Sequence, residues 1–423
     1  MQSCTLFPGT APGPPVYRWH SGRRLAPLLA PALLVAALGC SEGAESPTAP
    51  ESAAPALAAA APLSFRQVSA GRNHTCGVTT DDRAFCWGNN TWGQLGDGAP
   101  GFDRFAPVRV LGGLRFRHVS AGLDHTCGVT TNDRAFCWGR NDFNQLGDAS
   151  SASRPTPGAV ASGGRRFRQV RAGGSHTCAL TLSDVAFCWG WNGAGQLGDG
   201  TTTKREVPVR VLGGLRWGQL NAGGGYTCGV TTDNRAYCWG GNTEPEGDGG
   251  QLGDGTTTNR LRPVAVSGGL LIRQIDAALG YHTCAVTTAD RAYCWGVGGN
   301  GQLGNGTTTV QKTPVAVAGV RGYGHVSTGF RHSCGVSLAG RGFCWGWNGS
   351  GQLGIGTADS DPHPTPALVG NGLPLLQVSA GYIHTCGLTT GGLAYCWGKN
   401  VHGQLGDGTS TDRATPVAVA GAM

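Results

Sequence analysis

The sequence lacks the short motifs that identify the common catalytic sites. It contains no Walker pattern, no nucleophile elbow and no HExxH segment, which gives no support to a P-loop nucleotide site, an α/β-hydrolase or a zincin-type protease. Segments of the form GxGxxG begin at Gly193 and Gly299, but no helix is expected after either of them. A dinucleotide site needs that helix, so these segments do not predict one.

Helical periodicity and charge are also scarce. Only 13% of the residues are charged, and no basic run or stripe occurs in the chain. The formal net charge of +7 includes Arg18, Arg23 and Arg24 near the amino terminus, and the remaining cations are mixed with acidic residues. This distribution argues against a nucleic-acid partner.

A repeat is the main feature that the sequence does contain. The segment HTCGVTTDDRAFCWG spans residues 74–88 and holds Cys76 and Cys86, with WG directly after the second cysteine. Seven such segments follow one another at steps of 50 to 56 residues, and each is followed by a QLG triplet. Self-similarity at this period indicates a propeller or a solenoid.

Each unit reads as four short β-strands. FRQVSAG, HTCGVTT and RAFCWG are rich in β-branched and aromatic residues, and PVRV opens with a proline that suits an edge strand. The 74 glycines recur in register beside tryptophan and leucine, where turns are needed, which argues against disorder. We predict an all-β fold, a seven-bladed β-propeller over residues 65–423 with four short antiparallel strands per blade.

The cysteine spacing predicts disulfides within the blades. Cys76 and Cys86 are symmetric about Asp81, so a tight hairpin places them opposite each other on paired strands. Free buried thiols and a metal site with His74 are the alternatives. The metal site is disfavoured because zinc prefers four ligands in closely spaced pairs, and because the fourth unit has Tyr226 in place of the histidine. The predicted bridges are Cys76–Cys86, Cys127–Cys137, Cys178–Cys188, Cys228–Cys238, Cys284–Cys294, Cys334–Cys344 and Cys386–Cys396.

The amino-terminal segment predicts export. Two arginines precede an apolar stretch that ends in ALGC, so residues 1–39 are typical of a secretory signal and Cys40 of a lipidation site like that of bacterial lipoproteins. Simple cleavage and secretion is the alternative. Residues 40–62 are rich in Ala, Pro and Ser and predict a disordered tether. An oxidising compartment would also favour the predicted disulfides.

The combined signature AGxxHTCGVT…CWGxNxxGQLGDGTTT…PVxV resembles the repeat of the RCC1 family, the regulator of chromosome condensation. The repeats cover residues 65 to 420, and the resemblance implies a seven-bladed propeller. The founding eukaryotic member is a nucleotide exchange factor for a small GTPase and binds chromatin, and a secreted bacterial member inhibits β-lactamases. Exchange activity enters here only as an alternative by family analogy, because no residues match a specific exchange site.

Residues that recur in every blade are expected to be structural. The histidine before the first cysteine, the tryptophan after the second, Leu95 and Asp97 all have equivalents in most or all of the units. A residue used in nearly every blade is more often a packing or hydrogen-bonding position than a catalyst. We therefore expect no catalytic residues, no metal site and no cofactor.

Positions at which the repeats disagree are the better candidates for function. The residues before each HTC triplet and the residue after each WG differ among the units, and strand direction places both sets at one end of the propeller. Aromatic and arginine side chains at the mouth of a rigid scaffold are typical of protein-binding surfaces, although neutral variation of surface loops gives the same pattern. The predicted partner-binding residues are Trp191, Trp347, Phe330, Arg331, Tyr382, Tyr281 and Arg140.

The sequence thus predicts a non-enzymatic, exported and monomeric binding propeller. Its partner is expected to be a protein of the cell envelope or a secreted protein. Contact with a membrane is expected only through a lipid anchor. A carbohydrate or cell-wall binding module is one alternative, because Trp191 and Trp347 suit stacking on sugars. A propeller hydrolase or lyase is the other.

Overall fold

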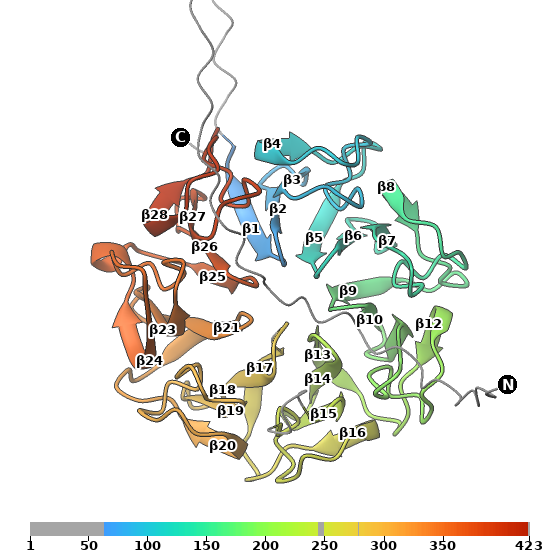
Figure 1. Ribbon diagram of the computed structural model, residues 1–423. Helices are drawn as coiled ribbons and strands as arrows, with labels where there is room; N and C mark the ends of the chain where they lie inside the picture. The colour runs from blue at the N-terminus through green and yellow to red at the C-terminus, as the bar shows by residue number, and fades with distance from the viewer. Residues whose placement is uncertain (1–62, 244–248, 278, 422–423) are drawn as a thin grey trace, which may run out of the picture. The chain divides into compact units, whose positions relative to one another are not determined.

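The computed structural model describes residues 63–243, 249–277 and 279–421. These residues form seven four-stranded antiparallel sheets arranged as blades around a central axis (Figure 1). Each sheet consists of four consecutive strands, which confirms the predicted propeller. The predicted signal, the tether and Cys40 lie outside the described residues.

The first blade shows why each segment takes its place. It contains β1 (Phe65–Ala70), β2 (His74–Thr79), β3 (Ala84–Gly88) and β4 (Arg104–Arg109), in that order from the axis outward. Every residue of β2 and β3 is buried, because both faces of these middle strands pack against neighbouring blades. Strand β4 is half-exposed and forms the outer edge, as its proline predicts.

The other blades repeat this order. The innermost strands are β5 (Phe116–Ala121), β9 (Phe167–Ala172), β13 (Trp217–Ala222), β17 (Ile272–Ala277), β21 (Tyr323–Thr328) and β25 (Gln377–Ala380). The second strands are β6 (His125–Thr130), β10 (His176–Thr181), β14 (Tyr226–Thr231), β18 (His282–Thr287), β22 (His332–Ser337) and β26 (His384–Leu388). The third strands are β7 (Ala135–Gly139), β11 (Ala186–Gly190), β15 (Ala236–Gly240), β19 (Ala292–Gly296), β23 (Gly342–Asn348) and β27 (Ala394–Gly398). The outermost strands are β8 (Arg154–Ala159), β12 (Arg205–Arg210), β16 (Arg260–Ala265), β20 (Gln311–Ala316), β24 (Asp359–Leu368) and β28 (Arg413–Ala418).

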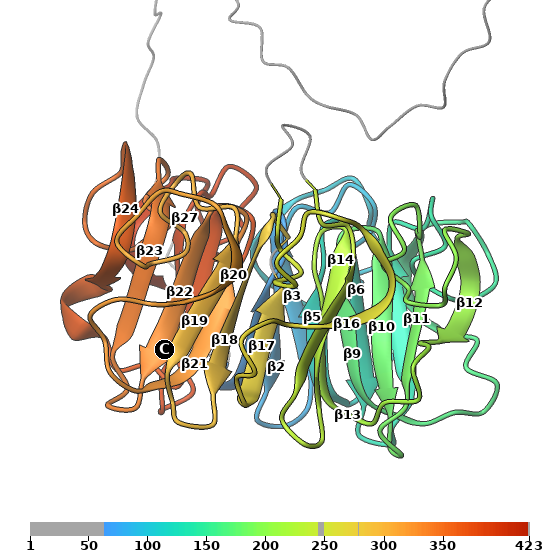
Figure 2. The ribbon, with the colours of Figure 1, turned by 90° about the horizontal axis from the view of Figure 1, so that it is seen from below.

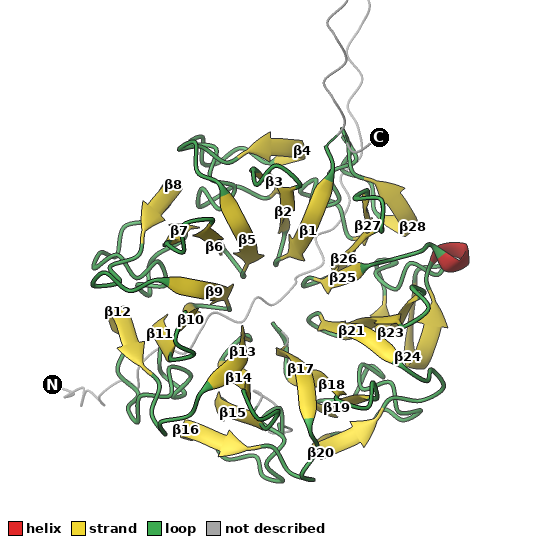
Figure 3. Ribbon diagram, turned by 180° about the vertical axis from the view of Figure 1, so that it is seen from behind, coloured by secondary structure: helices red, strands yellow, loops and turns green. Residues whose placement is uncertain are grey.

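Helical structure is almost absent from the part of the chain that the structure describes. A single turn of 3-10 helix, η1 (Gly370–Gly372), follows the long strand β24 at the outer rim (Figure 3). None of the described residues forms a helix that is long and apolar enough to cross a membrane.

The predicted disulfides are present in all seven blades. Cys76 pairs directly with Cys86 across β2 and β3, with Cα atoms 4.0 Å apart. The same register and bridge recur in the other blades, with Cα separations of 4.0 to 4.1 Å. The hairpin turn that sets this register has Asp82 in the left-handed region at φ 67°, a conformation that Asp, Asn and Gly tolerate best.

The hydrophobic core lies between blades rather than within them. Val78 and Leu95 of the first blade pack with Phe116 and Trp138 of the second. Trp138 is fully buried, and its indole Nε1 donates a hydrogen bond to the backbone oxygen of Gln94 at 2.9 Å. The equivalent cluster recurs at each blade interface, so one blade cannot bury its apolar surface without the next.

Every strand pairs only within its own blade, so the ring closes through side-chain contacts and backbone hydrogen bonds of the loops. The first and last blades lie side by side (Figure 1). Figure 2 shows the ring from its edge, with neighbouring blades packed against one another. Thr75 is hydrogen-bonded to His384 at 2.8 Å, and Trp87 donates to the backbone oxygen of Gln404 at 3.0 Å. These are the same contacts that join the other blades, so the seam between the ends of the chain is a regular interface.

Candidate binding surface

One end of the propeller carries the loops whose sequences differ most among the blades. Strand direction brings the β1–β2 loop and the segment after β3 to this end, together with their equivalents, and we call it the mouth. The backbone amide of Asn89 donates to the oxygen of Asn73 at 2.8 Å, which joins the two predicted variable sets directly. Their predicted placement at one end is therefore confirmed.

Backbone hydrogen bonds between neighbouring blades hold these loops around the axis. Tyr382 donates to the oxygen of Gly71 at 3.0 Å, and Arg72 donates to the oxygen of Gly122 at 3.1 Å. A Cβ atom at Gly71 would lie 2.5 Å from that same oxygen of Gly122, so a side chain would separate the two blades. The close glycine contacts fix the backbone from which the variable side chains project.

Aromatic and arginine side chains form a first cluster at the sixth, seventh and first blades. The rings of Phe330 and Tyr382 are stacked, with centroids 4.0 Å apart. The guanidinium of Arg331 lies 5.3 Å from the centroid of Phe330, and that of Arg72 lies 5.7 Å from the centroid of Tyr382. Arg331 is exposed and the two rings are half-buried, so the cluster offers a flat apolar surface flanked by two cations.

A second cluster lies across the first, second and third blades. Arg140 lies 4.8 Å from the centroid of Trp92 and 5.9 Å from that of Phe143. Phe143 in turn contacts Trp191, with ring centroids 6.4 Å apart. The guanidinium of Arg140 is held by ion pairs with Asp124 and Asp142 at 3.4 Å and 2.8 Å, which orient it between the two aromatic rings.

A surface pocket of about 700 Å³ opens beside the first cluster. Tyr281, Phe330 and Arg331 line it together with the apolar side chains of Val297 and Val310. The pocket therefore lies between the fifth and sixth blades and shares two residues with the first cluster.

The structure brings Phe330, Arg331 and Tyr382 together, as their places in the neighbouring sixth and seventh units predict. Trp347 lies next to Arg331, to whose backbone oxygen its amide donates at 2.9 Å, but its ring joins neither cluster. Sequence reasoning missed Trp92 and Phe143, which occupy equivalent positions two residues before the glutamine of the QLG triplet. That position also differs among the units, and a wider search for divergent positions would have found it.

The recurring histidines are structural, as predicted. Thr126 donates its only hydroxyl proton to the backbone oxygen of Gln94 at 2.8 Å, so it accepts from Nε2–H of His74 at 2.9 Å. Burial lowers the pKa of this imidazole, and of its five equivalents, to about 3, so they are neutral at neutral pH. In the fourth blade the hydroxyl of Tyr226 instead donates to the backbone oxygen of His282 at 2.6 Å.

The recurring aspartates form ion pairs with arginine. Asp97 accepts from Arg104 at 2.8 Å and from the side-chain amide of Asn90 at 2.9 Å, which ties the loop after β3 to the start of β4. The same ion pair recurs between Asp199 and Arg205 at 2.6 Å. Among the described residues no group of three or more His, Cys, Asp or Glu side chains is placed to hold a metal ion.

Comparison with known proteins places the fold in a family. Residues 35–322 match the RCC1-like domain, and residues 339–388 and 391–423 match the regulator of chromosome condensation (RCC1) repeat. The ultraviolet-B receptor UVR8 of Arabidopsis thaliana is 33% identical over 82% of this chain and 80% of its own length. The chain belongs to the RCC1 family.

Other relatives share the RCC1-like propeller in different settings. The human E3 ubiquitin-protein ligase HERC2 is 30% identical over 60% of this chain, but the match spans only 5% of the ligase. Human WBSCR16 has the same fold, with a TM-score of 0.71 at 22% identity over 80% of this chain and 94% of its own. Yeast RCC1 (Prp20), solved bound to Kap60, has a TM-score of 0.70 at 20% identity over 85% of each chain.

Proposed function

We propose that this protein is a non-enzymatic binding propeller that engages a protein partner through the mouth. The observation that carries the proposal is the first cluster, in which the stacked rings of Phe330 and Tyr382 lie between the guanidinium groups of Arg72 and Arg331. Aromatic residues and arginine supply most of the binding energy in protein interfaces. The adjoining pocket, which Tyr281 helps to line, offers a recess for a side chain of the partner.

The relatives support a partner of this class. Yeast RCC1 was solved in complex with Kap60, and a second structure of the yeast protein is described with its binding to Gsp1p and histones. These partners belong to those proteins. They show that an RCC1-type propeller serves as a protein-binding scaffold, and the mouth of this chain has its own set of side chains.

The proposed compartment is outside the cytoplasm. Seven disulfides are typical of proteins that fold in an oxidising environment and are rare in cytosolic proteins. Together with the signal pattern before Cys40, they support export with a lipid anchor or plain secretion. The partner is then a protein of the cell envelope or a secreted protein.

The test is affinity capture from an envelope extract and from culture medium, with the oxidised propeller as bait. Phe330→Ala and Arg331→Ala change the first cluster, whereas Leu338→Ala and Arg341→Ala are matched controls in the same blade. Both control residues are exposed and lie in the turn between β22 and β23, at the end opposite the mouth. A partner that is captured by the controls and lost by the cluster variants supports the proposal.

The affinity for the captured partner should then be measured with purified proteins. Truncation of one anchor is expected to cost about 2 kcal/mol of binding, which is roughly a 30-fold loss. Equal affinity for wild type, Phe330→Ala and Arg331→Ala would refute the assignment of this surface. Binding to a glycan array that depends on Trp191 or Trp347 would favour a carbohydrate-binding module instead.

A further inference from the structure

The central channel has a wall of regularly spaced polar side chains. The innermost strands contribute one residue each at equivalent positions. These residues are Ser69, Ser120, Arg171, Asn221, Asp276, Ser327 and Ser379. The four serines share a structural role, because each hydroxyl accepts a hydrogen bond from a backbone amide of the next blade, at 2.9 to 3.1 Å.

Three consecutive blades depart from this pattern. Asp276 keeps the role of the serine, since its Oδ2 accepts from the backbone amide of Thr328 at 2.7 Å and from the hydroxyl of Thr328 at 3.0 Å. Its Oδ1 accepts from the side-chain amide of Asn221. Arg171 cannot take this role, because a guanidinium has no acceptor for the amide of the next blade.

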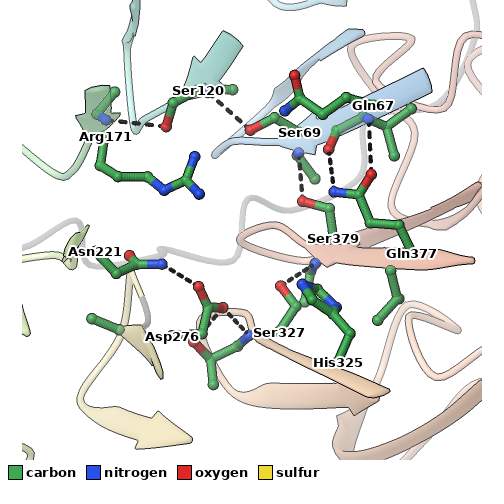
Figure 4. Close-up of a pocket in the computed structure, with 18 of the residues that line it drawn as sticks. Gln67, Ser69, Ser120, Arg171, Asn221, Asp276, His325, Ser327, Gln377 and Ser379 are labelled. Atoms are coloured by element: carbon green, nitrogen blue, oxygen red, sulfur yellow. Dashed lines mark hydrogen bonds between the residues drawn. The ribbon is translucent and has the colours of Figure 1, made fainter. Parts of the chain in front are cut away.

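Arg171 forms no hydrogen bond and no ion pair within the described part of the chain. Figure 4 shows its guanidinium directed into the channel, with Asn221 between Arg171 and Asp276 along the wall. Among the described residues, no oxygen accepts a hydrogen bond from it and no carboxylate lies within 4.0 Å of it. Burial lowers the pKa of Arg171 and raises that of Asp276, and the electrostatic attraction between the two groups opposes both shifts.

The surroundings limit what this pair can hold. In the channel lining that the structure describes, Arg171 is the only arginine or lysine and Asp276 is the only carboxylate. The cavity between the seven inner strands has a volume of about 220 Å³. That volume corresponds to roughly seven waters, enough for a molecule of the size of a small amino acid. A guanidinium binds a carboxylate through two parallel hydrogen bonds, and a carboxylate has further lone pairs for an ammonium group.

We propose that the channel is a binding site for a small zwitterion, an amino acid with an uncharged side chain, whose carboxylate binds Arg171 and whose ammonium group binds Asp276. A doubly charged anion such as phosphate fits less well, because Asp276 repels it. The site lies inside the ring, separate from the protein-binding surface proposed at the mouth. Each can therefore fail without the other.

The channel is tested by isothermal titration calorimetry on the oxidised propeller, with L-alanine and L-serine as probes and acetate, methylamine and inorganic phosphate as comparisons. Arg171→Ser and Asp276→Ser restore the residue that four other blades have at this position, so both variants are expected to fold. Each should weaken binding of the amino acid by roughly 10- to 100-fold, because each removes a hydrogen-bonded charge. Arg341→Ala, which removes an exposed arginine in the turn between β22 and β23, is the matched control and should leave this affinity unchanged.

A second readout does not depend on the choice of probe. If Arg171 is kept for a ligand, its unpaired charge destabilises the empty channel, and Arg171→Ser should raise the melting temperature of the ligand-free protein. A lower melting temperature for Arg171→Ser would mean that the arginine is structural and would overturn the proposal. Failure of both amino acids to bind, or tighter binding of acetate or phosphate, would overturn the assignment of a zwitterion.

Discussion

The middle strands of a blade and the mouth loops of the same blade belong to one repeat, yet the seven copies agree in the first region and differ in the second. In the middle strands the recurring side chains bond to a neighbouring blade, as Trp138 does to Gln94 and His74 to Thr126. At the mouth the backbone is fixed by contacts between blades, but side chains such as Arg331 face solvent. A regular framework thus leaves its variable positions free for recognition.

The largest expected difference between the two regions appears in acid. The six buried histidines have a pKa of about 3 in the folded protein against 6.5 ordinarily, so the unfolded chain binds more protons between these pH values. Their contribution to stability is complete above pH 6.5 and is lost as the pH falls towards 3. Melting temperatures should therefore change little from pH 7.5 to about 6.5 and fall continuously from there to pH 4.

The fourth blade provides the control for this prediction. It has Tyr226 at the histidine position, so His125→Tyr removes one imidazole and should reduce the dependence of the melting temperature on pH. A melting temperature that stays constant between pH 7.5 and 4 would contradict the assignment of the histidines as neutral framework groups.

Truncation of a framework tryptophan has the next largest effect. Trp345 is fully buried and donates to the backbone oxygen of Gln302 at 2.9 Å. Trp345→Ala leaves a large cavity between two blades and should cost about 3–5 kcal/mol of stability. The free energy of unfolding in denaturant measures this, and a loss below about 1 kcal/mol would contradict the role of the residue in the core.

Removal of one disulfide should have a smaller effect. Cys76 and Cys86 close a loop of about 11 residues, so replacement of both by alanine should cost roughly 2.7 kcal/mol by loss of chain-entropy stabilisation. In the native protein these sulfurs are fully buried and bridged, so the blade cysteines should not react with a thiol reagent until the protein is unfolded and reduced. Rapid labelling of native, unreduced protein would contradict this prediction.

The smallest effect on stability is expected at the mouth. Trp347 lies two residues from Trp345 but is half-buried at the surface, and truncation of Phe330 removes surface contacts with Tyr382 and Arg331. Trp347→Ala and Phe330→Ala should therefore change the free energy of unfolding by about 1 kcal/mol or less. If either destabilises the protein as much as Trp345→Ala does, the mouth residues belong to the core and the comparison fails.

Much of the fold was predictable because each repeat carries the same pattern of strand, turn and cysteine residues. The ten-residue spacing of Cys76 and Cys86 specifies their register across a hairpin, and the structure confirms it in every blade. Strand direction alone placed both variable sets at one end. The side-chain pairings at the mouth were harder to predict from the sequence. Arg140, for example, contacts Trp92 of another blade, 48 positions away (140 − 92 = 48).

The sequence by itself determined the number of blades, the strands of each blade, the disulfide pairs and the structural nature of the repeated histidine and tryptophan. These follow from local patterns and from their repetition, which limit each strand to one register. Only the tertiary structure decided that Arg171 and Asp276 face the same channel and that Phe330 stacks on Tyr382. These contacts arise when the ring closes, because the angle between neighbouring blades decides which side chains converge at the axis and at the mouth.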